Sequence, residues 1–423
     1  MKGLVFEYKL PRLAIATLAG QFGLRGYLTP HGFLRYQDLP EPRLLGDDWV
    51  VIRTLLCGVC GSDHKQVFLD GNYDNPMTAV ISWPQILGHE VVGTIACVGP
   101  KVTRVKVGDR VVLNPWISCA PRGIDPPCAP CAAGKNTLCR NFTHGRVSPG
   151  IHTGNSSDVT GGFAELVPAH ETMALPIPEG VTWDQAVLAD PFSVAFHSVL
   201  KVRPQPGSTC AVYGCGNLGL LTVHILKRLF PGVRVIAIAA FPHQAEMARR
   251  FGADLVLEAF PAYRVIERVA QEVGCEVYYL KPKKPWLLEG VDFVFDTVAS
   301  AQTLETGVRI VKARTRDGRS GVIVVTGVSS PKRFEWTPWY FKEVRVIGSN
   351  AFAVEEFEGR REHSYGHYFR FLQAGRVDPT AMLTHRFPLD RYQDALVCAH
   401  DQKGHGSVKV LFTYATPPGG LAR

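Results

Sequence analysis

The pattern of apolar and polar positions changes in character part-way along the chain. Up to about residue 185 it consists of short apolar runs, among them WVVIRTLL, VVGTIACVG and DRVVLNP, which glycine and proline interrupt. Short runs rich in valine and isoleucine are typical of strands, and glycine and proline mark the turns between them. Helical periodicity is scarce here, so we predict an irregular domain built mainly of strands.

From about residue 186 the pattern follows the order strand, glycine-rich turn, helix and strand. CAVYG is followed by NLGLLTVHILKRLF, which has an apolar face, and then by VRVIAIAA. This is the order of a βαβ unit. Further buried strands are predicted at ADLVL, VDFVFDTV, GVIVVTG and VRVIGS, with helical stretches between several of them. The pattern therefore predicts an α/β domain with a doubly wound parallel sheet.

The last part of the chain contains a predicted helix, HYFRFLQAGRV, and a predicted strand, SVKVLFTY. We expect this strand to return to the first domain. The expected division is thus a discontinuous β-rich domain of residues 1–188 and 352–423, and an α/β domain of residues 189–351. With 423 residues, the chain is long enough for two such cores.

Composition argues against several other classes of protein. No run approaches the roughly 18 to 20 consecutive apolar residues of a membrane span. The apolar stretch LAIATLAG is short, so we interpret it as a strand or core segment of a cytoplasmic protein without a membrane partner. The net charge of +8 is spread along the chain, which does not favour a nucleic-acid partner. Eleven cysteines in a long chain without an export signal favour metal binding over disulfides.

Two short motifs in the first domain carry the residue types that zinc prefers. CGVCGSDH spans residues 57–64, and GHE spans residues 88–90. Zinc takes thiolate, imidazole and carboxylate ligands, and a catalytic zinc keeps one position open for water or substrate. Cys60 and His89, together with an acid, could supply that set.

A glycine-rich turn lies between the first strand and the helix of the βαβ unit. Its glycines permit a tight turn, close backbone approach to a pyrophosphate and close helix packing, and they are Gly214, Gly216 and Gly219. Asn217 and Leu218 lie at the positive end of the helix, which favours an anion. The segment therefore predicts a dinucleotide site.

The position that would distinguish the two nicotinamide cofactors departs from the NAD pattern. An acid about 20 residues after the last glycine commonly binds the ribose hydroxyls of NAD. Ala239 occupies that place. Its side chain does not repel a 2′-phosphate, and His243 or Arg249 could approach one, although Arg249 could equally lie on the exposed face of a helix. NAD and NADP both stay open.

These motifs, in this order, resemble those of the zinc-containing medium-chain dehydrogenase/reductase family, the alcohol dehydrogenase superfamily. The resemblance covers nearly the whole chain and includes GHEVVGTIACVGPKVTRVKVGDRVV, a cysteine-rich lobe, GGFAELV, the nucleotide turn and SVKVLF. It implies a GroES-like β-rich catalytic domain beside a Rossmann α/β domain, and a homodimer or homotetramer. It also implies NAD or NADP as cofactor, a catalytic zinc and a structural zinc.

The resemblance assigns roles to residues around the first two motifs. It makes Cys60, His89 and Asp190 the ligands of the catalytic zinc, because LADPFSVAFHSV matches the segment that enters the cofactor domain. Asp190 could instead cap the helix before Pro191. Glu90 corresponds to the family's acid behind the metal. An acid as third ligand is nearer to the polyol, sugar, threonine and formaldehyde dehydrogenase branches than to the branch that uses two cysteines.

Three further residues receive expectations from the resemblance. Ser62 corresponds to the hydroxyl that accepts the substrate proton, or it is only a turn hydroxyl. His64 lies four residues after Cys60, whereas the outer histidine of the relay in many members lies five residues after, so its place in a relay is in doubt. Lys409 in SVKVLF matches a basic position that contacts pyrophosphate, or it is a solvated strand residue.

The second cysteine cluster resembles the family's structural zinc lobe. Cys128, Cys131 and Cys139 have the spacing C-x2-C-x7-C of its last three ligands. The fourth ligand is displaced. Cys119 is preferred, because a longer loop closes around zinc at small entropic cost, and Asp125 is the alternative. A metal-free lobe of reduced thiols is the remaining alternative.

Together the motifs and the resemblance predict a zinc- and NAD(P)-dependent alcohol dehydrogenase. Its expected substrate is a small molecule: a secondary alcohol, a polyol, a sugar, or the corresponding ketone. One alternative is a formaldehyde-type or other aldehyde-linked zinc dehydrogenase. Another is a zinc- and nucleotide-binding module without turnover, which the intact Cys60, His89, Asp190 and Ser62 argue against.

Overall fold

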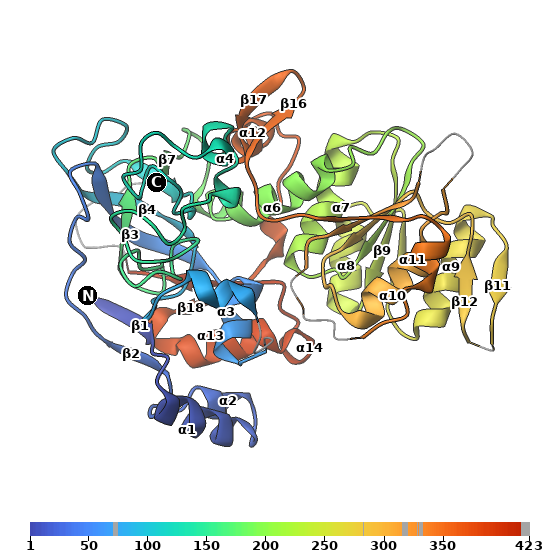
Figure 1. Ribbon diagram of the computed structural model, residues 1–423, viewed down its shortest axis with the longest axis horizontal. Coiled ribbons are helices and arrows are strands. Elements are labelled where there is room, and N and C mark those ends of the chain that lie inside the picture. Colours follow the sequence, from blue (N-terminus) through green and yellow to red (C-terminus); the bar gives the residue numbers. More distant parts are fainter. Residues whose placement is uncertain (71–74, 282, 315–319, 328, 330–332, 416–423) are drawn as a thin grey trace. The chain divides into compact units, whose positions relative to one another are not determined.

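Two large β-sheets organise the chain, each in a unit of its own (Figure 1). Unit 1 comprises Met1–Asp190 and Leu383–Arg423, and unit 2 comprises Pro191–Met382. The computed structural model describes residues 1–70, 75–281, 283–314, 320–327, 329 and 333–415.

This division differs from the expected one, which assigned residues 352–382 to the β-rich domain. They belong to unit 2. Aromatic contacts explain the difference. The ring centroid of Tyr368 lies 4.4 Å from that of Phe192, and the ring centroid of Phe371 lies 5.7 Å from that of Phe196. Such contacts depend on tertiary packing, which the local pattern of the chain does not reveal.

The large sheet of unit 1 is antiparallel except at one edge. Its strand order is β18-β19-β3-β4-β5-β7, with β6 paired to β3, and β18 runs parallel to β19. SVKVLFTY forms β19, which pairs with β3. The strands are β3 (Trp49–Gly58), β4 (Glu90–Val98), β5 (Arg110–Leu113), β6 (Leu166–His170), β7 (Ala174–Pro176), β18 (Leu383–Pro388) and β19 (Lys409–Thr413). A separate antiparallel pair consists of β1 (Lys2–Phe6) and β2 (Leu34–Asp38).

The helices of unit 1 are short. They are α1 (Leu10–Gly20), α2 (Leu24–Tyr27), α3 (Gly61–Val67), α4 (Ala129–Ala132), α5 (Trp183–Ala186), α13 (Tyr392–His400) and α14 (Gln402–His405), with 3-10 turns at Pro76–Val80, Asn136–Leu138 and Leu389–Arg391. The prediction of a strand or core segment at LAIATLAG is wrong, because this stretch lies in α1 and only Ala16 of that helix is buried. Leucine and alanine favour a helix, and Pro11 in its first turn is compatible with one.

Unit 2 contains a six-stranded sheet in the order β10-β9-β8-β13-β14-β15, and all its pairs are parallel. This is the strand order 3-2-1-4-5-6 of a Rossmann fold, so the α/β prediction is confirmed. The strands are β8 (Thr209–Tyr213), β9 (Arg234–Ala239), β10 (Leu255–Glu258), β13 (Phe293–Asp296), β14 (Val322–Val325) and β15 (Arg345–Gly348). Two hairpins are added, formed by β11 (Val277–Tyr279) with β12 (Pro285–Leu287) and by β16 (Val354–Phe357) with β17 (Arg360–His363).

The helix α6 contains the division between the units. Its first two residues belong to unit 1, and the rest belongs to unit 2. The helices from this point are α6 (Ala189–Leu200), α7 (Asn217–Leu229), α8 (Pro242–Arg250), α9 (Ala262–Val273), α10 (Ala301–Ile310), α11 (Thr337–Phe341) and α12 (Ser364–Gln373), with a 3-10 turn at Thr380–Met382. In the part of the chain that is described, no helix combines the length and the apolar character needed to cross a membrane.

Candidate metal centres and nucleotide turn

The first motif places Cys60 at the junction of β3 and α3. The strand ends at Gly58 and the helix begins at Gly61, so Cys60 is the residue that caps the helix. Its N–H donates to Asp63 Oδ2 at 2.9 Å, while its thiol accepts from the backbone of Asp63. This reciprocal capping fixes the position of the thiol.

Asp63 also connects the first motif to the second. Its carboxylate is buried, its Oδ1 lies 3.6 Å from His89 Nδ1, and it accepts the N–H of Gly88 at 3.4 Å. Burial lowers the pKa of His89, but the charges of Asp63 and Cys60 raise it well above its ordinary value. A carboxylate behind a metal-binding histidine orients the ring and makes its other nitrogen a stronger ligand. Sequence reasoning did not find this role for Asp63.

Cys60, His89 and Glu90 form one cluster, in which one candidate ligand atom of each residue lies within 4.8 Å of the others. Glu90 begins β4 and pairs with Gly58 of β3, where a Cβ would overlap the Glu90 carboxylate. The glycine therefore allows Glu90 to reach the cluster. His89 and Glu90 are both buried, and with Cys60 the cluster combines an imidazole, a carboxylate and a thiol. Donors of these three types fit a zinc ion.

Asp190 lies in the first turn of α6, at the end of the first segment of unit 1. It is buried, and its negative charge raises the pKa of both His89 and Lys409, which places it near the cluster. Its carboxylate is nevertheless not in the set of atoms within 4.8 Å, whereas that of Glu90 is. The structure thus brings two of the three expected ligands together, Cys60 and His89, and adds Glu90 to them.

A buried ion pair lies beside this cluster. Lys409, the first residue of β19, pairs with Glu90, and both side chains are 1% exposed. Its ammonium also donates to the Val59 carbonyl at 3.2 Å. Burial lowers the pKa of Lys409, but the charges of Glu90 and Cys60 raise it above its ordinary value. The alternative of a solvated Lys409 is therefore wrong, and its contact with a pyrophosphate stays a prediction.

Ser62 and His64 both lie in α3. Ser62 is exposed, two residues after Cys60. The Nδ1 atom of His64 lies 3.2 Å from Nδ1 of His400 in α13, and the ring of His400 lies 4.5 Å from that of Phe68. Burial and the neighbouring His400 lower the pKa of His64 to about 3, so this imidazole is neutral. No sequence pattern indicated His400, because it is far from His64 along the chain.

A second histidine that the sequence did not indicate lies against the cluster. The ring centroid of His152 is 4.7 Å from that of His89 and 5.7 Å from that of Trp116. Its Nδ1 is 2.8 Å from the Thr153 carbonyl, which can only accept, so Nδ1 carries the proton and Nε2 is an acceptor. Burial and the charge of His89 lower the pKa of His152 to about 3. No motif spacing marks this residue.

The four-cysteine lobe also converges. Four Sγ atoms lie within 4.8 Å of one another, those of Cys119, Cys128, Cys131 and Cys139, and all four cysteines are free thiols. The Sγ atom of Cys139 is 3.7 Å from that of Cys119 and 4.0 Å from that of Cys128. Tetrahedral zinc with Zn–S bonds of about 2.3 Å separates its sulfurs by roughly 3.8 Å. The structure therefore brings Cys119 to the lobe, and Asp125 is not part of this group.

Backbone donors and one arginine surround these sulfurs. Burial opposes ionisation of Cys128, but the N–H groups of Arg140 and Cys131 lower the pKa of its thiol to about 6. Arg122, in the insert after Cys119, is fully buried. Its guanidinium donates five hydrogen bonds of 2.7 to 3.3 Å, to the carbonyls of Ile117, His144, Val147, Ser148 and Gly150. Arg122 thereby holds the segment around Cys119 against the segment that follows Cys139.

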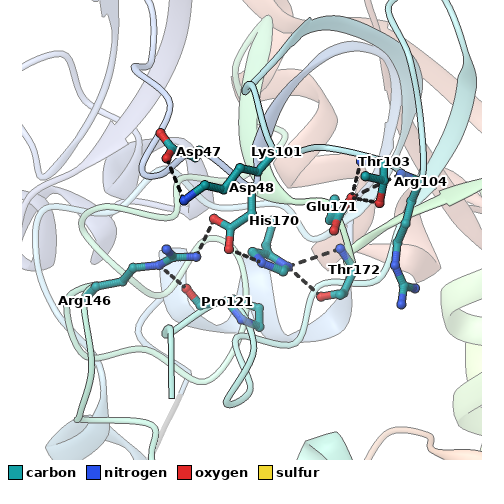
Figure 2. Close-up of polar contacts among 10 residues, drawn as sticks. All are labelled: Asp47, Asp48, Lys101, Thr103, Arg104, Pro121, Arg146, His170, Glu171 and Thr172. Carbon is teal, nitrogen blue, oxygen red and sulfur yellow. Dashed lines mark hydrogen bonds and ion pairs between the residues drawn. The ribbon is translucent and has the colours of Figure 1, made fainter. Parts of the chain in front are cut away.

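Figure 2 shows how the lobe is attached to the sheet. Asp48, just before β3, accepts a hydrogen bond from Arg146 Nη2 at 2.6 Å and lies 3.1 Å from His170 Nε2, at the end of β6. Arg146 also donates from Nε to the Pro121 carbonyl at 3.3 Å. Asp48 thus links Arg146, and through it the insert that follows Cys119, to a strand of the sheet.

The nucleotide turn has the predicted place, between β8 and α7 of unit 2. Gly214 has φ +88°, and a Cβ at Gly219 would overlap the Gly214 carbonyl, so both positions require glycine. Gly216 caps α7, which begins at Asn217 and continues with Leu218. Among the described residues, Asn217 Oδ1 is buried without a hydrogen-bond partner. A helix N-terminus of this kind fits a pyrophosphate.

Ala239 is the last residue of β9, where a nucleotide-binding sheet commonly presents the acid that reads the ribose. It pairs in register with Glu258 of β10. His243 lies in α8 with its ring stacked 5.7 Å from Phe241, and Arg249 is exposed in the last turn of that helix.

Two stretches of the chain match protein families. Residues 46–179 match the family described as "Alcohol dehydrogenase GroES-like domain", and residues 218–362 match "Zinc-binding dehydrogenase". The chain is also 32% identical to (R,R)-butanediol dehydrogenase of Saccharomyces cerevisiae. The match extends over 336 residues and covers 76% of this chain and 81% of that protein. The chain belongs to the zinc-containing alcohol dehydrogenase superfamily.

Other relatives extend this likeness. D-arabinitol dehydrogenase 1 of Uromyces fabae is 29% identical over 388 residues, which cover 91% of this chain and 95% of that protein. The structure of galactitol-1-phosphate dehydrogenase from Escherichia coli superimposes with a TM-score of 0.71, covers 98% of this chain and 100% of that one, and is 19% identical, so it shows the fold alone. The predicted family and fold class, a GroES-like domain with a Rossmann domain, are confirmed.

In this superfamily member, the sequence located the residues that lie in short motifs and missed those that support them. The motifs gave Cys60, His89, the four clustered cysteines and the nucleotide glycines. Asp63 had a visible signal, since a carboxylate three residues after a helix cap indicates a capping box. Arg122 and His152 had none, because their partners are set by the fold.

Proposed function

We propose that this chain is an alcohol dehydrogenase that transfers a hydride between a secondary alcohol, polyol or sugar and NAD(P), with zinc bound at Cys60 and His89. The cluster of thiol, imidazole and carboxylate donors in unit 1 carries this proposal. The glycine turn of the parallel sheet in unit 2 supports the nicotinamide cofactor. Relatives named as arabinitol and butanediol dehydrogenases support a substrate that carries several hydroxyls.

A zinc ion held there would supply Lewis acidity that lowers the pKa of the substrate hydroxyl, and a bound nicotinamide would accept the hydride. The residues of this chain do the rest. Asp63 orients the His89 ring. Lys409 balances the charge of Glu90. Ser62, exposed beside Cys60, accepts the substrate proton and passes it to solvent.

We infer Asp190 as the third protein ligand, with Glu90 able to replace it. Glu90 is already within 4.8 Å of both other donors, and Lys409 offers it a partner when it is not on the metal. The test is zinc affinity measured by competition with a chelator. Asp190→Asn should weaken zinc binding roughly 10- to 100-fold and Glu90→Gln less. A larger loss in Glu90→Gln would make Glu90 the resident ligand.

A hydroxyl-rich substrate would also find a hydrogen-bond acceptor next to the cluster. The Nε2 atom of neutral His152 can accept from a substrate hydroxyl, beside the indole of Trp116. We propose that this pair favours a vicinal diol over a simple alcohol. His152→Phe should raise the KM for a polyol while leaving a monohydric secondary alcohol nearly unaffected.

We propose a second, structural zinc on Cys119, Cys128, Cys131 and Cys139. The sulfur separations support tetrahedral coordination. Metal analysis should then approach two zinc ions per chain. A single zinc, with all four thiols freely alkylated in the folded protein, would count against it.

The experiment that tests the function is a screen of secondary alcohols, polyols, sugars and formaldehyde with NAD⁺ and NADP⁺, followed at the nicotinamide absorbance. Turnover of a polyol or secondary alcohol is the expected result. Turnover of formaldehyde alone would favour an aldehyde-linked enzyme. Cofactor binding without any turnover would indicate a binding module.

A further inference from the structure

The helical pair α1 and α2 presents an apolar face that the proposed reaction does not use. Figure 1 shows the pair, in dark blue, projecting from β1 and β2 of unit 1. It precedes residue 46, where the family match begins. One side of α1 rests on the unit, because Ala16 is buried and Leu13 packs on the unit 1 core.

The other side of α1 carries a stripe of exposed apolar residues. Leu10, Ala14 and Leu18 repeat every four residues, and Phe22 continues the spacing just after the helix. Leu10, Leu18 and Phe22 are 73%, 63% and 93% exposed, and the adjoining Ile15 is also exposed. A helix on a folded protein ordinarily turns such a stripe towards the core. Contiguous apolar surface of this kind marks an interaction site.

The pair is held in place by specific contacts. Tyr27 of α2 meets the edge of Phe68 with ring centroids 6.0 Å apart. Gln393 of α13 donates to the Leu28 carbonyl at 2.8 Å, and Arg12 of α1 donates to the Gly32 carbonyl at 3.3 Å. The apolar stripe is therefore a fixed surface of unit 1.

Cations outnumber carboxylates around this stripe. Residues 8–37 contain no aspartate or glutamate. Glu7 forms ion pairs with Lys9, Arg12 and Arg35. Asp394 forms ion pairs with Arg25 and Arg391. Five cations stand against these two carboxylates and the exposed Asp390, so the rim of the stripe carries net positive charge, and the side chains of Lys9 and Arg25 are each 64% exposed.

We propose that this face docks the enzyme on an anionic lipid surface, with Leu18 and Phe22 in the boundary between headgroups and acyl chains and Lys9 and Arg25 at lipid phosphates. An apolar helix face with basic flanks is the recognition chemistry of peripheral membrane proteins. A second copy of this chain fits less well, because a two-fold contact would place two positive rims against each other. The expectation of no membrane partner came from the absence of a spanning segment, and a helix that lies on the bilayer needs none.

The test is co-sedimentation of the purified full chain with two kinds of vesicle, phosphatidylcholine alone and an equal mixture of phosphatidylcholine and phosphatidylserine. The protein should bind the mixed vesicles, bind the neutral ones weakly, and be released by salt. The double variant Leu18→Ser/Phe22→Ser should bind about tenfold less or worse. Lys9→Gln/Arg25→Gln should lose roughly fivefold.

The matched control is Val107→Ser, which removes another exposed apolar side chain of unit 1 and should bind as the parent does. Dehydrogenase activity in solution should be unchanged in all these variants, so the result does not depend on the proposed function. Absence of binding to the mixed vesicles, or equal binding to both kinds, would overturn the proposal. Dissociation of an oligomer in the double variant, without vesicle binding in the parent, would assign the face to a second copy and overturn it too.

Discussion

The two candidate metal centres of unit 1 differ in the properties that decide what a metal does there. The cysteine lobe offers four sulfurs at near-tetrahedral spacing, and backbone N–H groups donate to several of them. The Cys60 cluster offers three different donor types. Charged side chains adjoin it, namely Asp63, Asp190 and Lys409.

The residues that surround the two centres also differ in what they contact. Arg122 holds the lobe through backbone carbonyls alone, so its contacts serve the shape of a loop with little core of its own. Lys409 and Asp63 instead face ionisable ligands, so their contacts tune charge and orientation. A metal whose four coordination positions are all filled by protein ligands stabilises a fold. A metal with one open coordination position, beside charged side chains, can bind and activate a substrate.

Loss of the Cys60 thiolate should reduce turnover more than any other change considered for the two centres. Cys60→Ser removes the thiolate from the Cys60 cluster. We expect kcat/KM to fall about a thousandfold or more, because transition-state charge is no longer stabilised. Zinc content should fall by one ion per chain while the melting temperature changes little. Cys97→Ser, which changes an exposed cysteine, is the control. Parent-like turnover in Cys60→Ser would remove this cluster from the mechanism.

The next effect breaks the support of the lobe. Arg122→Met leaves five carbonyls without their donor, so we expect the free energy of unfolding to fall by roughly 3 kcal/mol or more. The measurement is denaturant unfolding, with Arg140→Met, an exposed arginine beside Cys139, as the control. Turnover per folded molecule should stay close to the parent value. Equal stability of the two variants would show that Arg122 does not hold the lobe.

Metal removal should distinguish the centres by rate. A chelator should take zinc from the open cluster first, because ligand exchange needs an accessible position, and the closed thiolate site should lose zinc at least about tenfold more slowly. Activity would then vanish before Cys128 and Cys131 become open to alkylation. Loss of activity and thiol exposure at one common rate would contradict the distinction.

The smallest expected effect concerns the nucleotide turn of unit 2. We expect relaxed or NADP-leaning selectivity, because Ala239 neither binds ribose hydroxyls nor repels a phosphate. Ala239→Asp should shift the ratio of kcat/KM for the two cofactors about tenfold towards NAD⁺. A parent that strongly prefers NAD⁺ and does not respond to the change would assign the ribose to another residue, for which Glu258 is placed opposite Ala239.

The sequence could predict what depends on short spacings. Cys60, His89 and the turn at Gly214 stand in motifs of a few residues. The central strands of unit 2, β8, β9 and β13, are buried along nearly their whole length, so their apolar runs are easily recognised. It could not predict the pairing of Glu90 with Lys409, which are distant along the chain and meet only when β19 pairs with β3.

The N-terminal helix α1 shows the opposite difficulty. An apolar run ordinarily indicates burial, and that rule led to the prediction of a strand or core segment at LAIATLAG. In the structure, α1 covers only part of its apolar surface, with Ala16 buried, while Leu10 and Leu18 face outward. Only the positions of the neighbouring elements decide which side of an apolar helix is covered, and the local pattern does not contain them.

Polyol-dependent reduction of the nicotinamide cofactor by zinc-loaded, metal-stripped and zinc-restored protein decides whether Cys60 and His89 hold a catalytic zinc. We predict that turnover disappears when the open cluster is emptied and returns in proportion to the zinc restored there. Metal-stripped protein that turns over a polyol as fast as the zinc-loaded protein would show that Cys60 and His89 do not hold a catalytic zinc.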